Sequence, residues 1–192
     1  MQQRGSSLIE VVTTLALAGI VTAMSASSLT SLLHRRELRA AAAHVRGLLA
    51  VTNVTAQVRG RYRAIRFTQA DGTWAYSIYE DGNDNGVSID EVARGIDVRI
   101  AGPIPLIPPG VHASVDFPEP RPPDPDTRDP IAGSPVQFGS SAMCSFSPSG
   151  TCTPGTLFLT DGDKLAAMVR CSGSGSNLTV AFYGMTRAAW TD

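Results

Sequence analysis

The strongest feature of the hydropathy pattern is an apolar stretch near the start of the chain. From Leu8 to Leu33 the sequence has 26 residues and a single charged one, Glu10. Because roughly 20 apolar residues in a helix are enough to cross the core of a bilayer, the length of this stretch predicts a membrane-spanning helix. No later segment of the chain has the same character.

The apolar pattern continues beyond residue 33, but there it is confined to one stripe at helical spacing. Arg39 and Arg46 lie off this stripe. We therefore predict one helix over about residues 7–57, apolar all round in its first half and amphipathic in its second, with the second half lying on a sheet. Two helices with a break near residues 25–31 are the alternative. The stripe consists of Leu38, Ala41, Ala42, Val45, Leu48, Leu49, Thr52 and Ala56.

After the helical stretch, hydrophobic and polar residues alternate with a period of two, which is typical of β-strands. Residues 62–67 and 74–79 read as two strands of a hairpin joined by the Asp-Gly-Thr turn at 71–73. Further strands are predicted at residues 143–146, 155–160, 165–170 and 178–183. The predicted fold class is α+β, with a long N-terminal helix, first transmembrane and then amphipathic, packed on antiparallel β-sheets.

A proline-rich segment separates the two groups of strands. Residues 103–135 hold 11 of the 13 prolines in the chain. Proline has no backbone N–H to donate and fixes φ, so it disfavours both helices and central strands. This segment is predicted to be a surface loop, extended or disordered.

Composition and charge exclude several classes of function. The chain has 16 basic and 17 acidic residues, so its net charge of −1 gives no general reason to bind nucleic acid. Arg59, Arg61, Arg63 and Arg66 gather on one strand and its approach, where they form either a solvated strand face or a nucleic-acid face. The three histidines, at positions 34, 44 and 112, are not spaced as metal ligands, and no phosphate-binding glycine loop is present. The sequence therefore predicts that the chain is not an enzyme.

A short acidic segment has part of the pattern of a calcium-binding loop. Asp81, Asn83, Asn85 and Gly86 match positions 1, 3, 5 and 6 of such a loop, in which alternate residues point oxygens inward. Position 12 would be Val92, where a bidentate Glu is expected. Two interpretations stay open, a Ca²⁺ site and a solvated Asn/Asp/Gly turn. The candidate ligands for Ca²⁺ are Asp81, Asn83, Asn85, Val87 and Asp90.

The start of the chain resembles a known family signal. Gly5, followed by Ser-Ser-Leu-Ile-Glu and an apolar helix, is similar to the signal of type IV pilins and type II secretion pseudopilins. The resemblance implies that a prepilin peptidase cleaves after Gly5 and methylates the new N-terminus at Ser6, where the family usually has Phe. It also implies that Glu10 guides assembly by pairing with the N-terminal amine of a neighbouring subunit. A paired charge is far less costly than a lone one in a dry helical bundle.

The C-terminal part narrows the resemblance to one branch. The segment Phe-Ser-Pro-Ser-Gly-Thr that begins at Phe146, with Gly-Thr-Leu-Phe-Leu at 155–159, is similar to a motif of the GspH/FimT family of minor pilins and pseudopilins. The implied organisation is a leader peptide over 1–5, a transmembrane and filament-core helix over 6–33, its amphipathic continuation over 34–58, and a β-rich domain over 59–192.

The resemblance also implies a function and a location. The function is that of a structural subunit of a type II secretion pseudopilus or a type IV pilus, in its tip or initiation complex, for protein transport or pilus assembly. Its partners would be other pilins or pseudopilins through the helix, the prepilin peptidase and the bacterial inner membrane. The chain would cross that membrane once, with its C-terminal domain in the periplasm, before it enters the filament.

An alternative function is a minor pilin that binds DNA or surfaces through its globular domain. Some family members used for DNA uptake carry a Gly-Arg-x-Arg element before the last strand. Residues 174–177 here are Ser-Gly-Ser-Asn and contain no arginine. Because DNA contacts depend heavily on Lys and Arg, DNA is an unlikely partner.

Three cysteines lie in the last third of the chain, at Cys144, Cys152 and Cys171. The oxidising compartment that the resemblance implies would permit one disulfide and leave one thiol. Cys144 and Cys152 flank one predicted turn, and Cys152 and Cys171 flank the next two strands. Either pair can lie on adjacent strands, and three separate thiols are the third alternative.

Overall fold

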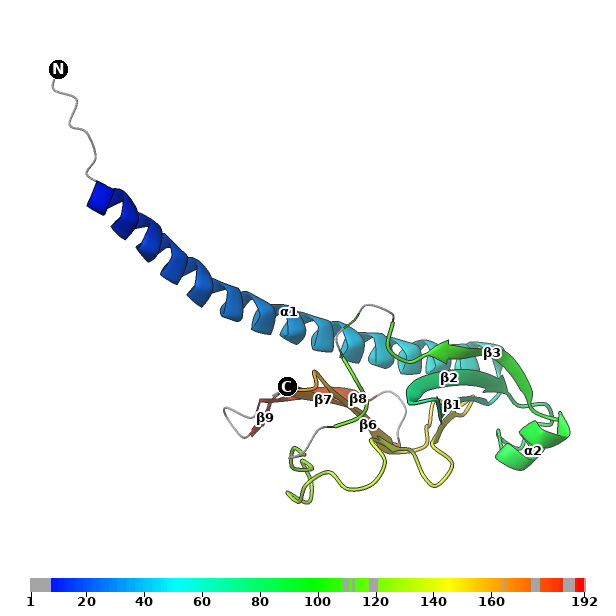
Figure 1. Cartoon of the computed structure of the whole chain (residues 1–192). Helices are drawn as coiled ribbons and strands as arrows, with labels where there is room; N and C mark the ends of the chain where they lie inside the picture. The colour runs from blue at the N-terminus through cyan, green and yellow to red at the C-terminus, as the bar shows by residue number, and fades with distance from the viewer. Residues whose placement is uncertain are drawn as a thin grey trace.

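A single long helix carries two antiparallel sheets in the computed structural model (Figure 1). The structure describes residues 8–108, 111, 113–117, 121–163, 165–173, 177–184 and 189–191, and it describes residues 21–31 by their backbone only. The helix, α1, spans Leu8–Arg59 without a break and has 52 residues. Its first part projects away from the sheets and its last part lies along them.

The end of α1 is set by a glycine. Gly60 has a φ of +65°, which L side chains rarely adopt, so the helix stops there. The backbone N–H of Gly60 donates to the carbonyl of Gln57, and that of Arg61 donates to the carbonyl of Ala56. These two bonds satisfy helix-end carbonyls that have no partner within the helix.

The first sheet has the strand order β3-β2-β1-β5. Its central hairpin turns at Asp71 and Gly72, which both have positive φ, as a two-residue hairpin loop of type I′ requires. The register places Ile65 opposite Ile78, and Phe67 opposite Tyr76. The strands are β1 (Arg63–Ala70), β2 (Thr73–Glu80), β3 (Val98–Pro105) and β5 (Met143–Phe146), and the short helix α2 (Ile89–Arg94) lies between β2 and β3.

The second sheet has the strand order β4-β6-β7-β8-β9, and every neighbouring pair is antiparallel. The predicted strands of the C-terminal region therefore overlap β5 to β8. The strands are β4 (Val136–Gln137), β6 (Gly155–Thr160), β7 (Leu165–Cys171), β8 (Leu178–Gly184) and β9 (Ala189–Thr191).

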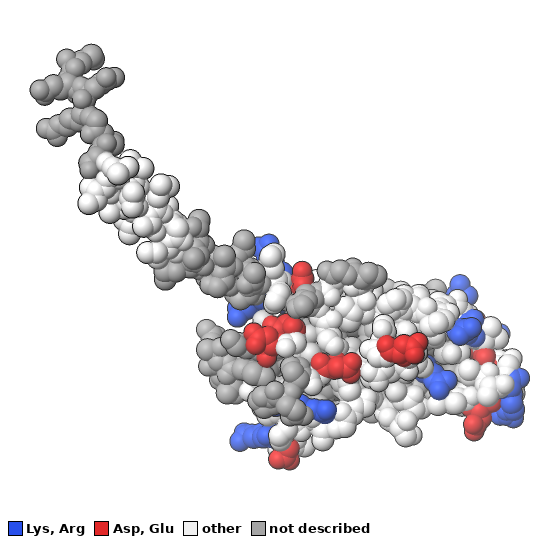
Figure 2. Space-filling model, viewed as in Figure 1, with Lys and Arg blue, Asp and Glu red and all other residues white. Residues whose placement is uncertain are grey.

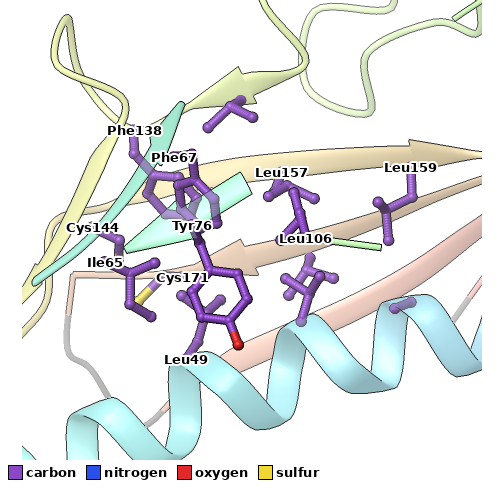
Figure 3. Close-up of a cluster of buried hydrophobic side chains, with 14 of the residues drawn as sticks. Leu49, Ile65, Phe67, Tyr76, Leu106, Phe138, Cys144, Leu157, Leu159 and Cys171 are labelled. Carbon is purple, nitrogen blue, oxygen red and sulfur yellow. The ribbon is translucent and has the colours of Figure 1, made fainter. Parts of the chain in front are cut away.

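The main core lies between α1 and the two sheets (Figure 3). Leu49 on α1, Ile65 on β1 and Leu157 on β6 are all fully buried in it. The stripe predicted from helical spacing supplies the helix side of this core, and all of its residues except the half-buried Leu48 are buried. Burying apolar area is the main favourable term in folding, so this contact fixes the helix on both sheets.

The proline-rich segment covers the outer face of the second sheet. Phe117 and Ile131 pack there against Phe158 of β6, with Trp190 of β9 beside them. The indole N–H of Trp190 donates to the carbonyl of Pro123 at 2.9 Å. The prediction of an extended or disordered surface loop missed this packing. The prolines exclude the regular backbone hydrogen bonds of a central strand, but they do not determine where the apolar residues between them pack.

The prediction of a membrane-spanning helix is wrong. Among the residues that the structure describes, no helical stretch is both long enough and apolar enough to cross a membrane. The apolar stretch with described side chains runs over residues 8–20 and would span about 20 Å, whereas a bilayer core is about 30 Å thick. The predicted fold class, with its transmembrane helix, and the predicted single-pass inner-membrane location are corrected accordingly. The described chain has nine strands in two antiparallel sheets and no helix that could cross a membrane.

Candidate functional site

The face of α1 that points away from the sheets is apolar over more than four turns. Val51, Val54 and Val58 on this face are exposed by 66%, 57% and 80%. At 100° per residue, Ala40, Ala43 and Gly47 fall on the same side of the helix, and all three are exposed. We call these six residues the outer face. A helix that needed only to cover a sheet would carry polar residues there.

The projecting part of α1, by which we mean residues 8–20, is exposed on every side. Leu8 is 83% exposed, Ile9 73%, Leu15 68%, and Leu17 63%. The structure gives these residues no sheet or loop to lie against (Figure 1). A helix that is apolar all round is normally buried, so this part of α1 lacks a cover within the described chain.

Glu10 is the acidic residue in the first turn of α1. A carboxylate at this end interacts favourably with the partial positive charge of the helix N-terminus. The hydroxyl of Thr14 donates to the backbone carbonyl of Glu10 at 2.9 Å, and that of Thr13 donates to it at 3.0 Å. Gly5 and Ser6, the predicted cleavage and methylation site, lie outside the described residues.

The acidic segment after β2 folds around the carboxylate of Asp81. This side chain is 1% exposed and accepts hydrogen bonds from the backbone N–H groups of Asn83, Asp84 and Gly86. Three N–H donors on one carboxylate fix the turn. The oxygens of Asp81 that would bind Ca²⁺ thus already accept hydrogen bonds from the loop itself.

Two further buried carboxylates hold the same loop. Glu91 accepts hydrogen bonds from the side-chain amides of Asn85 and Asn83, both at 3.0 Å, and these bonds lower the pKa of Glu91, that of Asn85 most. Asp97 accepts from the backbone N–H groups of Gly82 and Ser88. Neither Glu91, one residue before position 12 of the motif, nor Asp97, which lies beyond the motif, is among the calcium ligands predicted from the sequence.

The candidate calcium ligands have different surroundings. Val87, which would bind through its backbone carbonyl, buries its side chain in an apolar cluster with Ala64, and Asp90 is exposed on α2. Asn83 and Asn85 turn their amide groups toward Glu91 rather than toward Asp81. Across the described ranges, no group of three or more His, Cys, Asp or Glu residues is placed to hold a metal ion.

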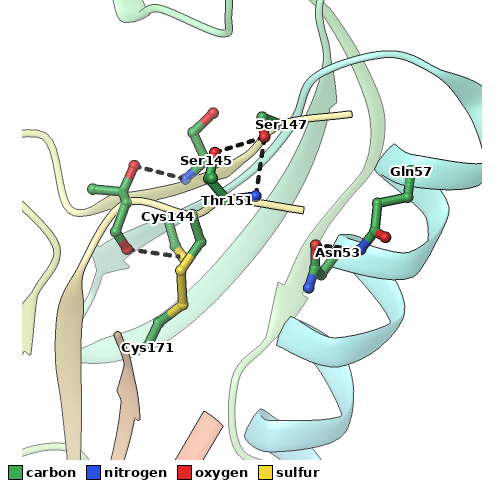
Figure 4. The surroundings of a disulfide bond; sticks show 9 residues. Asn53, Gln57, Cys144, Ser145, Ser147, Thr151 and Cys171 are labelled. Atoms are coloured by element: carbon green, nitrogen blue, oxygen red, sulfur yellow. Dashed lines mark hydrogen bonds between the residues drawn. A yellow bond between two sulfur atoms is a disulfide. The ribbon is translucent and has the colours of Figure 1, made fainter. Parts of the chain in front are cut away.

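The structure pairs Cys152 with Cys171 and leaves Cys144 as a buried thiol (Figure 4). Cys171 ends β7, and Cys152 pairs with Phe146 at the end of β5, so the disulfide ties the second sheet to the first. Burial raises the pKa of Cys144 well above its usual range. The thiolate is the reactive form of cysteine, so Cys144 is chemically inert where it lies.

Three of the four arginines near β1 are engaged within the chain. Nε of Arg63 donates to Glu80 at 2.9 Å, and a guanidinium nitrogen of Arg59 lies 3.8 Å from the same carboxylate. Arg61 donates to the backbone carbonyl of Asp81. Arg66 is half-buried. This set is therefore not an open row of cations of the kind that follows a nucleic-acid backbone.

Comparison with known proteins places the chain in no group. No protein-family model matches it, no curated protein matches its sequence and no solved structure matches its fold.

Proposed function

We propose that the chain is a structural subunit that assembles through α1 into a filament of the type IV pilin or type II secretion pseudopilin kind. The observation that carries this proposal is the exposed apolar surface of α1, on its projecting part and on its outer face. Contiguous apolar surface of this extent is uncommon on a protein that acts alone and usually marks an interaction site. The chemistry of the surface calls for other apolar helices as the cover.

The residues of the outer face suit packing between helices. Ala40, Ala43 and Gly47 are small, and a Cβ added at Gly47 would meet no atom within 4 Å. Small residues allow two helices to approach closely, and the valines that follow supply apolar area to bury. The projecting part, apolar all round, suits the interior of a bundle.

Glu10 has a defined role in this proposal. Cleavage after Gly5 would create a positively charged amine at Ser6, close in sequence to Glu10. Within a bundle of apolar helices, a carboxylate without a partner would be strongly unfavourable, whereas a carboxylate paired with the amine of a neighbour is tolerated. The pair would therefore set the axial register between subunits.

The DNA-binding alternative has no supporting observation. Of the four arginines that would form its face, Arg59 and Arg63 contact Glu80 and Arg61 donates to a backbone carbonyl. We therefore propose only the structural role. Whether the filament serves protein export or pilus assembly is tested by a deletion. A deletion scored in parallel for exoprotein secretion, twitching and DNA uptake separates the two machines.

Assembly is tested with two glutamate substitutions on the same helix. Val54→Glu places a charge on the outer face, whereas the control Arg46→Glu lies about a quarter-turn away from Val54 round the helix. Both positions are exposed, so both variants should melt close to the unsubstituted chain. We expect Val54→Glu to be lost from sheared filaments and Arg46→Glu to be incorporated. Normal incorporation of Val54→Glu would remove the proposal.

A further inference from the structure

A groove with one basic wall and one apolar wall lies beside α1 where the helix leaves the sheet domain. Arg35 and Arg39 are one turn apart on the helix and line a groove of about 370 Å³. The facing wall is formed by the ends of β8 and β9 and includes Phe182 and Tyr183. Leu38, which also lines the groove, is 1% exposed and belongs to the main core. The groove is therefore built on packed parts of the fold.

The side chain of Arg39 is held in place at this groove. Its guanidinium carbon lies 5.5 Å from the centre of the Phe182 ring. This cation–π contact uses the face of the guanidinium and leaves its N–H donors available to a ligand. Because the side chain is already ordered, binding a ligand costs less conformational entropy than it would at a mobile arginine.

The two arginines have no carboxylate partner within the described chain. No acidic residue is among the described residues that line the groove, and neither Arg35 nor Arg39 is in an ion pair there. Figure 2 shows acidic side chains near basic ones where the helix meets the sheets. Glu37, which lies between the two arginines in sequence, is about 160° round the helix from both and already interacts within the chain. Like charges four residues apart repel on a helix, so an anion bound between Arg35 and Arg39 would relieve that repulsion.

We infer that this groove binds an extended acidic segment of a second protein, in which carboxylates alternate with apolar side chains. Successive side chains of an extended segment point to opposite sides, and those on one side are about 6.8 Å apart. Arg35 and Arg39 are separated by about 6 Å along the helix axis, so two alternate carboxylates match the two guanidiniums. Each guanidinium binds a carboxylate in a two-pronged geometry.

The apolar wall decides between this ligand and a simple anion. A phosphate or a small organic acid would use the charge of the arginines alone. The residues between the carboxylates of an extended segment face the opposite wall, where Phe182 and Leu165 are half-buried and offer apolar surface. Burial of apolar side chains there adds to the attraction between the charges.

The groove is separate from the outer face of α1. Arg35 and Arg39 lie about 100° and about 60° round the helix from Val54. The inference therefore goes beyond the proposed assembly and does not depend on it. It gives the subunit a partner outside the bundle of α1 helices.

Binding is measured by fluorescence anisotropy, with the full-length chain in a non-ionic detergent and a labelled peptide of three Asp-Leu repeats. We expect saturable binding that weakens as the salt concentration rises. Arg39→Gln should weaken binding by about five-fold or more, and Arg35→Gln/Arg39→Gln by about ten-fold or more. The matched control Arg36→Gln removes a charge at the same level of α1, about 100° from Arg35, and should change the affinity by less than about two-fold. All three arginines are exposed, so the variants should melt close to the unsubstituted chain.

Charge reversal and a second peptide complete the test. Arg35→Glu/Arg39→Glu should lose the acidic peptide and bind a peptide of three Lys-Leu repeats, and Val54→Glu should bind the acidic peptide normally. Absence of saturable binding, or an equal effect of Arg36→Gln and Arg39→Gln, would overturn the inference. Equally tight binding of three Asp-Ser repeats would also overturn it, because the apolar wall would then have no role. An affinity for the peptide that falls as the protein concentration rises would show that another copy of the chain fills the groove, and the choice of a second protein would be wrong.

Discussion

Removal of the Cys152–Cys171 disulfide should destabilise the whole β domain. The bridge joins residues 19 apart in sequence, and both cysteines are buried. In the chain-entropy description, opening a loop of this length costs about 3 kcal/mol at 25 °C. The cost should be felt in both sheets, because the backbone N–H of Cys152 bonds to Gly173 after β7 while that of Thr153 bonds to Ser145 in β5.

The perturbation is the double variant Cys152→Ala/Cys171→Ala, measured by urea unfolding. Removing both cysteines leaves neither free to pair with Cys144. The fluorescence of Trp74 on β2 and Trp190 on β9 reports on one sheet each. We expect both probes to shift together by about 3 kcal/mol, and reduction of the unsubstituted chain to reproduce the shift.

The control is Cys144→Ala, which removes a buried sulfur without touching the bridge. Losing one buried atom from the core should cost about 1 kcal/mol. The reasoning is refuted if the double variant unfolds within about 0.5 kcal/mol of the unsubstituted chain, or if the Cys144→Ala control costs as much. A shift in the Trp190 signal alone would show that the bridge stabilises one sheet and does not tie the two together.

Three other predictions concern single residues: Glu91, Gly155 and the proposed N-terminal residue Ser6. Hydrogen bonds lower the pKa of Glu91, so the stability that it contributes is present above its unfolded pKa and is lost as pH falls through its folded pKa; Glu91→Gln should therefore lower the melting temperature at pH 7 and have less effect in acid. A Cβ at Gly155 would clash with the carbonyl oxygen of Gln137, so Gly155→Ala should cost about 1–3 kcal/mol in urea unfolding. Gly47→Ala, with open space around the helix, should not destabilise. Intact-mass measurement of the chain from assembled filaments should show a methylated N-terminus at Ser6, and Glu10→Gln should leave this processing intact but reduce incorporation; an unprocessed N-terminus in filaments would contradict the proposed role of Gly5.

Local sequence rules located much of the secondary structure because they depend on neighbouring residues. The Asp71–Gly72 turn can be read directly, since these residues tolerate the positive φ that a tight hairpin needs. The stripe around Leu49 follows from helical spacing. The sequence pattern also places a turn at Asp81, but it cannot show which backbone N–H groups of the loop donate to the Asp81 carboxylate.

The features that were missed depend on contacts between distant segments. The disulfide partner of Cys152 is decided by where β7 lies relative to β5, and the spacing of the cysteines left two pairs open. Phe117 and Ile131 sit among prolines, and only the position of Phe158 shows that they cover a sheet. The membrane-spanning prediction failed because the length and low charge of residues 8–33 were treated as sufficient evidence for a membrane helix.

The two faces of α1 show why the hydropathy pattern of a helix does not reveal whether an apolar face is buried within the chain or exposed. Leu49 on the inner side is fully buried, and Val54 on the outer face is 57% exposed, although both are apolar. Hydropathy alone cannot distinguish these two residues, because both side chains are apolar and both would gain free energy on burial. The inner side finds its cover within the chain and so contributes to folding. The outer face has no cover among the described residues, and in the proposed assembly another copy of the chain would supply that cover.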